Sequence, residues 1–356
     1  MCPSVCRGRG RFRTEMDAVR CYTLDFFPEN ILIDILSYLS VRELVRNSRV
    51  CRRWKQLVKD QRLWRAVDLS TWKRVTSRVL WALLRQYLGH GLRLLRLRGL
   101  LLSARAGVFL SESWLRALGS KCPRLRRLVL IHTDLRGLPS CRLLPLSLQA
   151  LELHFCEVPA GFFCEGDGVE TLVLDSVPSF SDQHLCSLSA WRGLTRLELR
   201  DLIRVTVAGL KSCVPPGAHT LARLTHLELE TGSRTQMVAL GLGEGWPGLE
   251  RLSLGGKEVG PGLLSLGRLQ DLRSLRLRTC RLTQMMVLRS CRCLTRLRQL
   301  EFIEVEFVED EVRSDETDRP PASDDDPAPS LRRALRSMLP ACATHFSRCT
   351  RAVNKD

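Results

Sequence analysis

Apolar residues recur along most of the chain in one spacing, apolar-x-x-apolar-x-apolar. The pattern occurs ten times between Trp64 and Phe302, and from Leu125 onward successive copies begin 21 to 30 residues apart. Its second and third apolar residues flank a single intervening residue, as in a short strand that buries one face. The pattern therefore predicts one strand in each copy of an internal repeat. The predicted strands contain Val67, Leu95, Leu128, Leu151, Leu172, Leu197, Leu227, Leu252, Leu275 and Leu300.

Helix signals lie between these strands. Ser111 precedes the apolar residues Trp114 and Leu115, and Gly119 stands where such a helix should end. Each unit thus combines a strand with a helix. Stacked units of this kind bend into a horseshoe, because helices need more room than strands. We expect an α/β solenoid of about ten strand–helix units over residues 69–303.

Residues 24–68, ahead of the repeats, have the pattern of three short helices. Pro28 suits the start of the first helix, because its missing N–H leaves no hydrogen bond unmade there. Three helices of this size cannot bury their apolar side chains among themselves, so we expect a partner to cover the surplus. The apolar residues are Ile31, Leu32, Ile35, Leu36 and Leu39 in the first helix, Leu44 in the second, and Val50, Cys51 and Trp54 in the third.

This segment resembles an F-box. The resemblance rests on Pro28, Leu36 to Leu39, Val50-Cys51, Trp54 and Leu63-Trp64-Arg65, while the usual Leu-Pro opening is Phe27-Pro28 here. Together with the repeats, it resembles the F-box and leucine-rich-repeat family over roughly residues 24–303.

The resemblance implies a substrate-recognition subunit of an SCF-type ubiquitin ligase. In that family the F-box docks on a Skp-type adaptor, which joins it to a cullin and a RING subunit, and the repeats bind target proteins for ubiquitination and proteasomal degradation. The adaptor contacts that we carry over are Phe27, Pro28, Ile31, Leu32, Ile35, Leu36, Leu39, Leu44, Val50 and Trp54.

The target-binding surface is expected on the concave side of the horseshoe, because side chains alternate along each strand. The expected carboxylates come from consecutive strands about 5 Å apart, so we predict an acidic band that receives a basic segment of the target, with an apolar anchor beside it. The anchor is Val129, Ile131 and Val173, and the full predicted set adds Arg96, Glu152, Asp175, Glu198, Glu228, Glu230 and Arg276.

The net charge of +17 is uneven. Residues 303–356 hold eight Lys/Arg and twelve Asp/Glu, a balance of −4, which leaves +21 for residues 1–302. Such a body could attract nucleic acid. However, most of its arginines alternate with leucines, as solvated repeat positions do, and no nucleic-acid module accompanies them. We therefore expect protein partners and no nucleic acid.

No run of about 18 apolar residues predicts a membrane span, and the Arg-rich start lacks the apolar core of a secretory signal. We expect a protein of the cytoplasm, the nucleus or both, with no membrane partner. The fifteen cysteines are odd in number and predict reduced thiols. Cys156 and Cys280 occupy an inward position of the repeat, and Cys291 and Cys293 lack the spacing and the nearby His of a zinc site.

Catalytic motifs are lacking. The chain has no phosphate-binding glycine loop, no G-x-S-x-G and no H-E-x-x-H, so we predict no cofactor, no metal and no catalytic residue. The expected role is a receptor subunit rather than an enzyme. The alternative is a leucine-rich-repeat scaffold that works outside a ubiquitin ligase.

The flanking segments differ in composition from the repeats. Residues 1–23 are basic and predicted to be disordered, and Met16 offers a second translation start. Residues 304–330 are acidic and contain prolines, which predicts a disordered linker. Residues 331–356 form a tail with a possible short helix that ends near Pro340; it either docks on the open end of the solenoid or is a divergent terminus.

Overall fold

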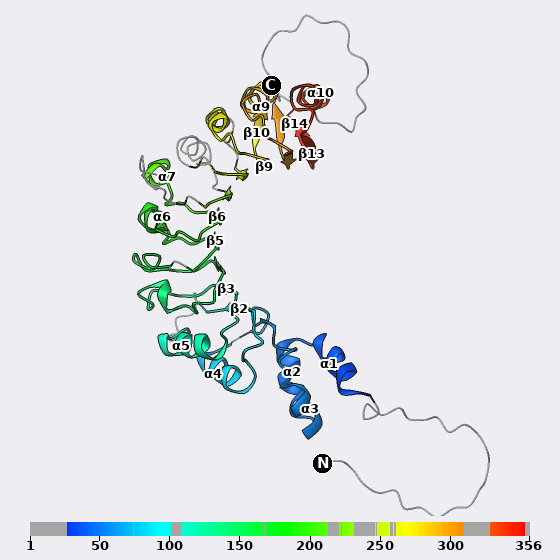
Figure 1. Cartoon of the computed structure of the whole chain (residues 1–356), viewed down its shortest axis with the longest axis vertical. Helices are drawn as coiled ribbons and strands as arrows, with labels where there is room; N and C mark the ends of the chain where they lie inside the picture. Colours follow the sequence, from blue (N-terminus) through cyan, green and yellow to red (C-terminus); the bar gives the residue numbers. More distant parts are fainter. Residues whose placement is uncertain are drawn as a thin grey trace, which may run out of the picture.

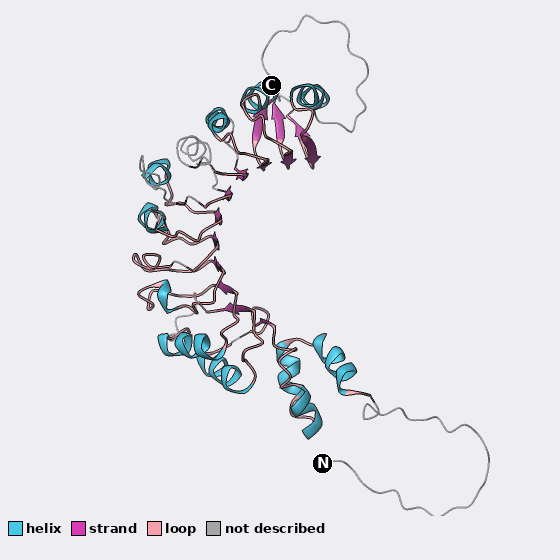
Figure 2. Cartoon of the chain, viewed as in Figure 1, coloured by secondary structure: helices cyan, strands magenta, loops and turns pink. Residues whose placement is uncertain are grey.

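The computed structural model describes residues 27–352, except 74, 101–108, 167, 189, 213–220, 222, 231–245, 247, 257–258, 260 and 309–327. Within these residues, eleven parallel strands form one sheet that follows the inside of an arc (Figures 1 and 2). The strands are β1 (Ala66–Asp68), β2 (Leu94–Arg98), β3 (Arg127–Ile131), β4 (Ala150–His154), β5 (Thr171–Asp175), β6 (Arg196–Arg200), β7 (His226–Glu230), β8 (Arg251–Gly255), β9 (Ser274–Arg278), β11 (Gln299–Ile303) and β13 (Ala343–Ser347).

The register of the sheet aligns the repeated leucines. Leu95 lies opposite Leu128, Leu128 opposite Leu151, and the same alignment continues from strand to strand as far as Leu300. These side chains are buried in one continuous core. The predicted α/β leucine-rich-repeat solenoid is therefore confirmed.

Helices cover the outer side of the arc (Figure 2). The side chain of Ser111 accepts a hydrogen bond from the backbone N–H of Trp114, so it caps its helix as the sequence indicates. Helices are wider than strands, which gives the stack its curvature. The outer elements are α4 (Ser77–Gln86), α5 (Glu112–Lys121), the 3-10 helix η2 (Cys141–Leu143), α6 (Asp182–Leu188), α7 (Val207–Ser212), the 3-10 helix η3 (Pro261–Arg268), α9 (Gln284–Cys291) and α10 (Pro329–Met338).

Three short helices precede the sheet, α1 (Glu29–Ser37), α2 (Val41–Asn47) and α3 (Arg52–Leu57). Pro28 is the N-cap of α1, one position before the first helical residue. Ser40 and Glu43 form a capping box at the start of α2. The buried residues of these helices belong to the same core as the repeats, so the helical module and the solenoid are joined by packing.

The repeats extend beyond their predicted end at Ile303. Strand β13 pairs with β11 in parallel, Leu331 and Leu335 of α10 are fully buried, and Phe346 stacks on Phe302 with ring centroids 4.8 Å apart. A second, three-stranded sheet of β10 (Arg281–Thr283), β12 (Glu306–Val308) and β14 (Thr350–Arg351) lies beside it.

The tail thus forms a further repeat that covers the end of the solenoid. The sequence pattern missed it because Thr344 occupies the position that Leu300 holds in the preceding strand. Strand β12 also falls inside the predicted linker of residues 304–330. Most of that linker and the predicted disordered residues 1–23 lie outside the described residues.

Candidate adaptor-binding and target-binding surfaces

Helix α1 has apolar residues on two opposite sides. Leu32, Ile33 and Leu36 face inward and are at most 4% exposed. On the other side, Ile31 and Ile35 are 43% and 47% exposed. Tyr38 follows at the same helical spacing and is 90% exposed. Exposed apolar side chains gathered on one helix face are typical of an interaction site. We call Ile31, Ile35 and Tyr38 the α1 row.

The predicted adaptor contacts divide by exposure. Phe27, Pro28 and Val50 are exposed, as is the α1 row, and Leu39 and Trp54 are half-buried. Leu32, Leu36 and Leu44 lie in the core, so they support the helices and do not face a partner. Tyr38 was absent from the predicted contacts, although its place on the helix wheel beside Ile31 and Ile35 already indicated it.

The predicted target-binding residues do lie on consecutive strands. Glu152 is opposite both Val129 and Val173, and Glu198 is opposite Glu228. Along β1 to β11, the positions that alternate with the buried leucines carry eight arginines and seven carboxylates. These are Arg96, Arg98, Arg127, Arg196, Arg200, Arg251, Arg276 and Arg278, and Asp68, Glu152, Asp175, Glu198, Glu228, Glu230 and Glu301.

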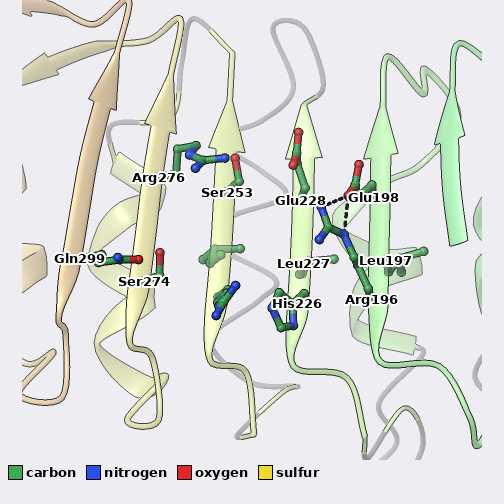
Figure 3. Close-up of a pocket in the computed structure, with 12 residues that line it drawn as sticks. Arg196, Leu197, Glu198, His226, Leu227, Glu228, Ser253, Ser274, Arg276 and Gln299 are labelled. Atoms are coloured by element: carbon green, nitrogen blue, oxygen red, sulfur yellow. Dashed lines mark hydrogen bonds and ion pairs between the residues drawn. The ribbon is translucent and has the colours of Figure 1, made fainter. Parts of the chain in front are cut away.

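The seven carboxylates are paired with arginines or with His154 and do not form the predicted acidic band. Arg200 donates to Glu198 over 2.7 Å and to Glu228 over 3.0 Å. Arg278 reaches Glu228 at 3.2 Å and Glu230 at 3.5 Å. Arg196 donates to Glu198 over 2.6 Å, and Figure 3 shows the two side chains together. Further along the arc, Arg96 pairs with Asp68 and Arg276 with Glu301.

A second cluster surrounds His154. Its Nδ1 lies 3.2 Å from Asp175 and its Nε2 lies 3.6 Å from Glu152, which also accepts a hydrogen bond from Arg127. The hydrogen bond with Glu152 raises the pKa of His154, and Asp175 adds to this effect against the opposing effect of burial. Burial alone would raise the pKa of Glu152, but His154 and Arg127 outweigh it and leave that pKa below its ordinary value.

The predicted apolar anchor is mostly inaccessible. Val129 is 1% and Val173 7% exposed, which leaves Ile131, half-buried, as the part of the anchor that a partner can reach. The sequence did not predict the nearby pair His132 and Phe155, whose rings stack with centroids 4.8 Å apart.

A hollow of about 280 Å³ opens on the concave side between β6 and β11. We call it the β8 hollow, and Figure 3 shows its residues. Its lining combines the paired carboxylates of β6 and β7 with arginine, hydroxyl and amide side chains of β8, β9 and β11. The polar lining residues are Arg196, Glu198, His226, Glu228, Arg251, Ser253, Ser274, Arg276 and Gln299.

The cysteines pack as thiols. Burial raises the pKa of Cys156, Cys280 and Cys291 to about 12, so these side chains are protonated near neutral pH. Among the described residues, no group of three or more His, Cys, Asp and Glu side chains could hold a metal ion. None of the described helices is both long and apolar enough to cross a membrane.

An F-box-like family model matches residues 24–70. This module, followed by the repeats, defines the chain as an F-box protein with a leucine-rich-repeat solenoid, and the chain belongs to the F-box/LRR-repeat family. It is 37% identical to mouse F-box/LRR-repeat protein 12 over 290 residues, which cover 78% of this chain and 88% of the mouse protein.

The human protein of that name is 42% identical over 213 residues. This match covers 58% of the chain and 64% of the human protein, just under two thirds of its length. Among solved structures, an internalin from Listeria monocytogenes is similar over 74% of this chain and 76% of its own, with 13% identity and a TM-score of 0.35.

Proposed function

We propose that this chain is the target-recognition subunit of an SCF-type ubiquitin ligase. The F-box binds a Skp-type adaptor, and the adaptor brings a cullin and a RING subunit. The concave side of the repeats holds the target protein while the other subunits ubiquitinate it. In this function the chain contributes binding surfaces and no catalytic group.

The α1 row is the observation that carries this proposal. Ile31 and Ile35 remain about half exposed while their neighbours Leu32 and Leu36 are buried, so the helix has a second apolar face beyond what its own fold needs. Fully burying an aliphatic side chain stabilises a complex by about 1.5–3 kcal/mol. An adaptor that covers the α1 row, Phe27 and Val50 would gain this energy from several residues at once.

The placement of the F-box also suits a receptor. It lies at one end of the arc, and the strands β5 to β9 lie further along it, so the proposed adaptor and target have separate places on the chain (Figure 1). The shared core fixes the F-box against the first repeat. A target held on the concave side would therefore keep a defined position relative to the adaptor and the subunits that follow it.

Capture of the adaptor tests this function. The full chain is co-expressed with a Skp-type adaptor and a cullin, and both are measured after purification. We expect Ile31→Asp with Ile35→Asp to abolish capture, because two charges would be buried without partners. Leu146→Asp is the matched control, since Leu146 is 93% exposed on the solenoid. Undiminished capture by the double variant would favour a scaffold outside a ubiquitin ligase.

A further inference from the structure

The β8 hollow has hydrogen-bond donors that lack acceptors. The Oγ atom of Ser253 is buried and has no hydrogen-bond partner among the described residues. Arg251 is exposed and forms no ion pair with any described residue, and the side chains of Ser274 and Gln299 make no hydrogen bond within the described chain. Figure 3 shows Ser253, Ser274 and Gln299 on three neighbouring strands. A buried hydroxyl without a partner costs free energy that a ligand can recover.

The carboxylates across the hollow do not satisfy these donors. Glu198 is held by Arg196 and Arg200, and Glu228 by Arg200 and by Arg278 of β9. Arg276, on the other side, pairs with Glu301 of β11 at 2.6 Å.

Among the described residues, Arg251 is therefore a cation without an ion-pair partner. His226, beside it, adds no charge near neutral pH, because burial and the nearby arginines Arg251 and Arg196 lower its pKa.

We propose that the β8 hollow binds an oxyanion carried by the target protein, either a carboxylate or a phosphorylated side chain. Arg251 supplies the charge, and Ser253, Ser274 and Gln299 supply further donors. Guanidinium groups suit this role because their planar N–H groups match carboxylate and phosphate oxygens. The inference rests on the proposed function in one respect, that the occupant belongs to a bound target.

The size of the hollow favours a single side chain. Pockets for small molecules usually enclose about 300–1,000 Å³, and this hollow lies just below that range. It is also unsuited to a nucleic-acid strand. Among the described residues, no Phe, Tyr or Trp lines it to stack on a base.

The test uses arrays of random nonapeptides whose central residue is fixed as Ala, Lys, Glu or phosphoserine. The full chain is applied in complex with its adaptor, and bound protein is measured at each array. We expect about tenfold more binding to the Glu or the phosphoserine array than to the Ala array, as one charge-assisted hydrogen bond allows. The comparison of Glu with phosphoserine identifies the source of the oxyanion.

Variants locate the binding in the hollow. We expect Arg251→Glu to remove the preference for anionic peptides and shift it toward the Lys array. Arg289→Glu is the control, because Arg289 is also exposed but lies on the outer helix α9. Ser253→Ala should lower binding to the anionic arrays at least threefold while leaving the melting temperature unchanged or higher, because the removed hydroxyl has no hydrogen-bond partner among the described residues.

Three results would overturn the inference: equal binding to all four arrays, equal effects of the Arg251 and Arg289 variants, or binding of a 20-nucleotide RNA in place of the peptides. Failure of the proposed function is a different result. If the wild type fails to capture the adaptor, the proposed function fails, but the peptide preference of the hollow should persist. The Ile31→Asp, Ile35→Asp double variant, applied to the arrays without adaptor, should likewise keep that preference.

Discussion

The ring of Trp64 stacks on the ring of Tyr87, with centroids 4.7 Å apart and 21° between their planes. Trp64 lies near the end of the F-box and donates from Nε1 to the carbonyl of Val58, while Tyr87 is the C-cap of α4 in the first repeat. The Tyr87 hydroxyl lies 3.1 Å from the buried Ser48 of the F-box. These contacts cross the boundary between the two modules, which should therefore unfold together.

Replacing Trp64 tests the packing between the F-box and the first repeat. Trp64 is fully buried, so Trp64→Ala should lower the free energy of unfolding by about 3–5 kcal/mol. Tyr87→Phe keeps the stacked ring and removes one buried hydrogen bond, which should cost about 1 kcal/mol. Urea unfolding followed by circular dichroism measures both. Two separate unfolding transitions in the wild type would contradict a shared core.

Substitutions at the adjacent residues Leu36 and Ile35 of α1 should have different effects, the first on stability and the second on adaptor binding. Leu36 is 1% exposed, so Leu36→Ala should destabilise the free chain by about 2–5 kcal/mol. Ile35→Ala should change stability by about 0.5 kcal/mol or less, since the side chain is half exposed, but weaken adaptor binding about tenfold. Thermal unfolding and titration with the adaptor separate the two effects. Equal losses of stability in both variants would contradict the two-faced helix.

Replacing Arg200 should lower the free energy of unfolding more than replacing Arg96. Arg200 serves two carboxylates, one of which, Glu198, is 5% exposed, and after Arg200→Met Glu198 keeps only Arg196, so the change should cost about 1.5–3 kcal/mol. Arg96 pairs with the half-exposed Asp68, and Arg96→Met should cost about 1 kcal/mol or less. Chemical denaturation of the two variants under one set of conditions decides the order, and the reverse order would refute it.

His154 should make stability depend on pH. Its pKa is raised in the folded state, so the folded chain holds the proton more tightly. The stabilisation is fully present below the unfolded pKa of about 6.5 and is lost as pH rises through the folded value. We therefore expect the stability difference between wild type and His154→Gln to be largest below about pH 6.5 and to shrink at alkaline pH.

Urea unfolding between pH 5.5 and 9 measures this difference. Glu152 and Asp175 face the imidazole, and the lowered pKa of Glu152 keeps that carboxylate ionised across the range. His90→Gln is the control at an exposed histidine. A wild-type advantage over His154→Gln that grows with pH would contradict the assignment.

The sequence predicted the strands from β1 to β11 well because nearly all of them repeat the same two buried leucines, and a slip by one residue would turn these leucines to solvent. It predicted the end of the solenoid poorly, because the last strand has Thr344 in place of a leucine and is held by α10 and by Phe346 stacking on Phe302. Periodicity detects what repeats, and a terminal repeat is the least regular of its series.

The pairing of charged side chains was the second feature that the sequence did not predict. The concave carboxylates could be placed on their strands, but whether Glu198 is free or bound to Arg200 depends on rotamers and on neighbours across the sheet. The exposure of individual F-box side chains could not be predicted for the same reason, because it depends on neighbours in the fold. Leu36 and Ile35 are both apolar residues of one helix, and only the packing of α1 against the rest of the chain separates the core residue from the surface residue.

The pairing of charges on the concave side has a kinetic consequence. With eight arginines against seven carboxylates, this surface is almost neutral, so most of the chain's net charge of +17 lies elsewhere. Long-range attraction would then draw acidic molecules to other parts of the chain more than to the concave side. Partners of the concave side should therefore differ mainly in their dissociation rates. Their association rates should depend only weakly on salt concentration.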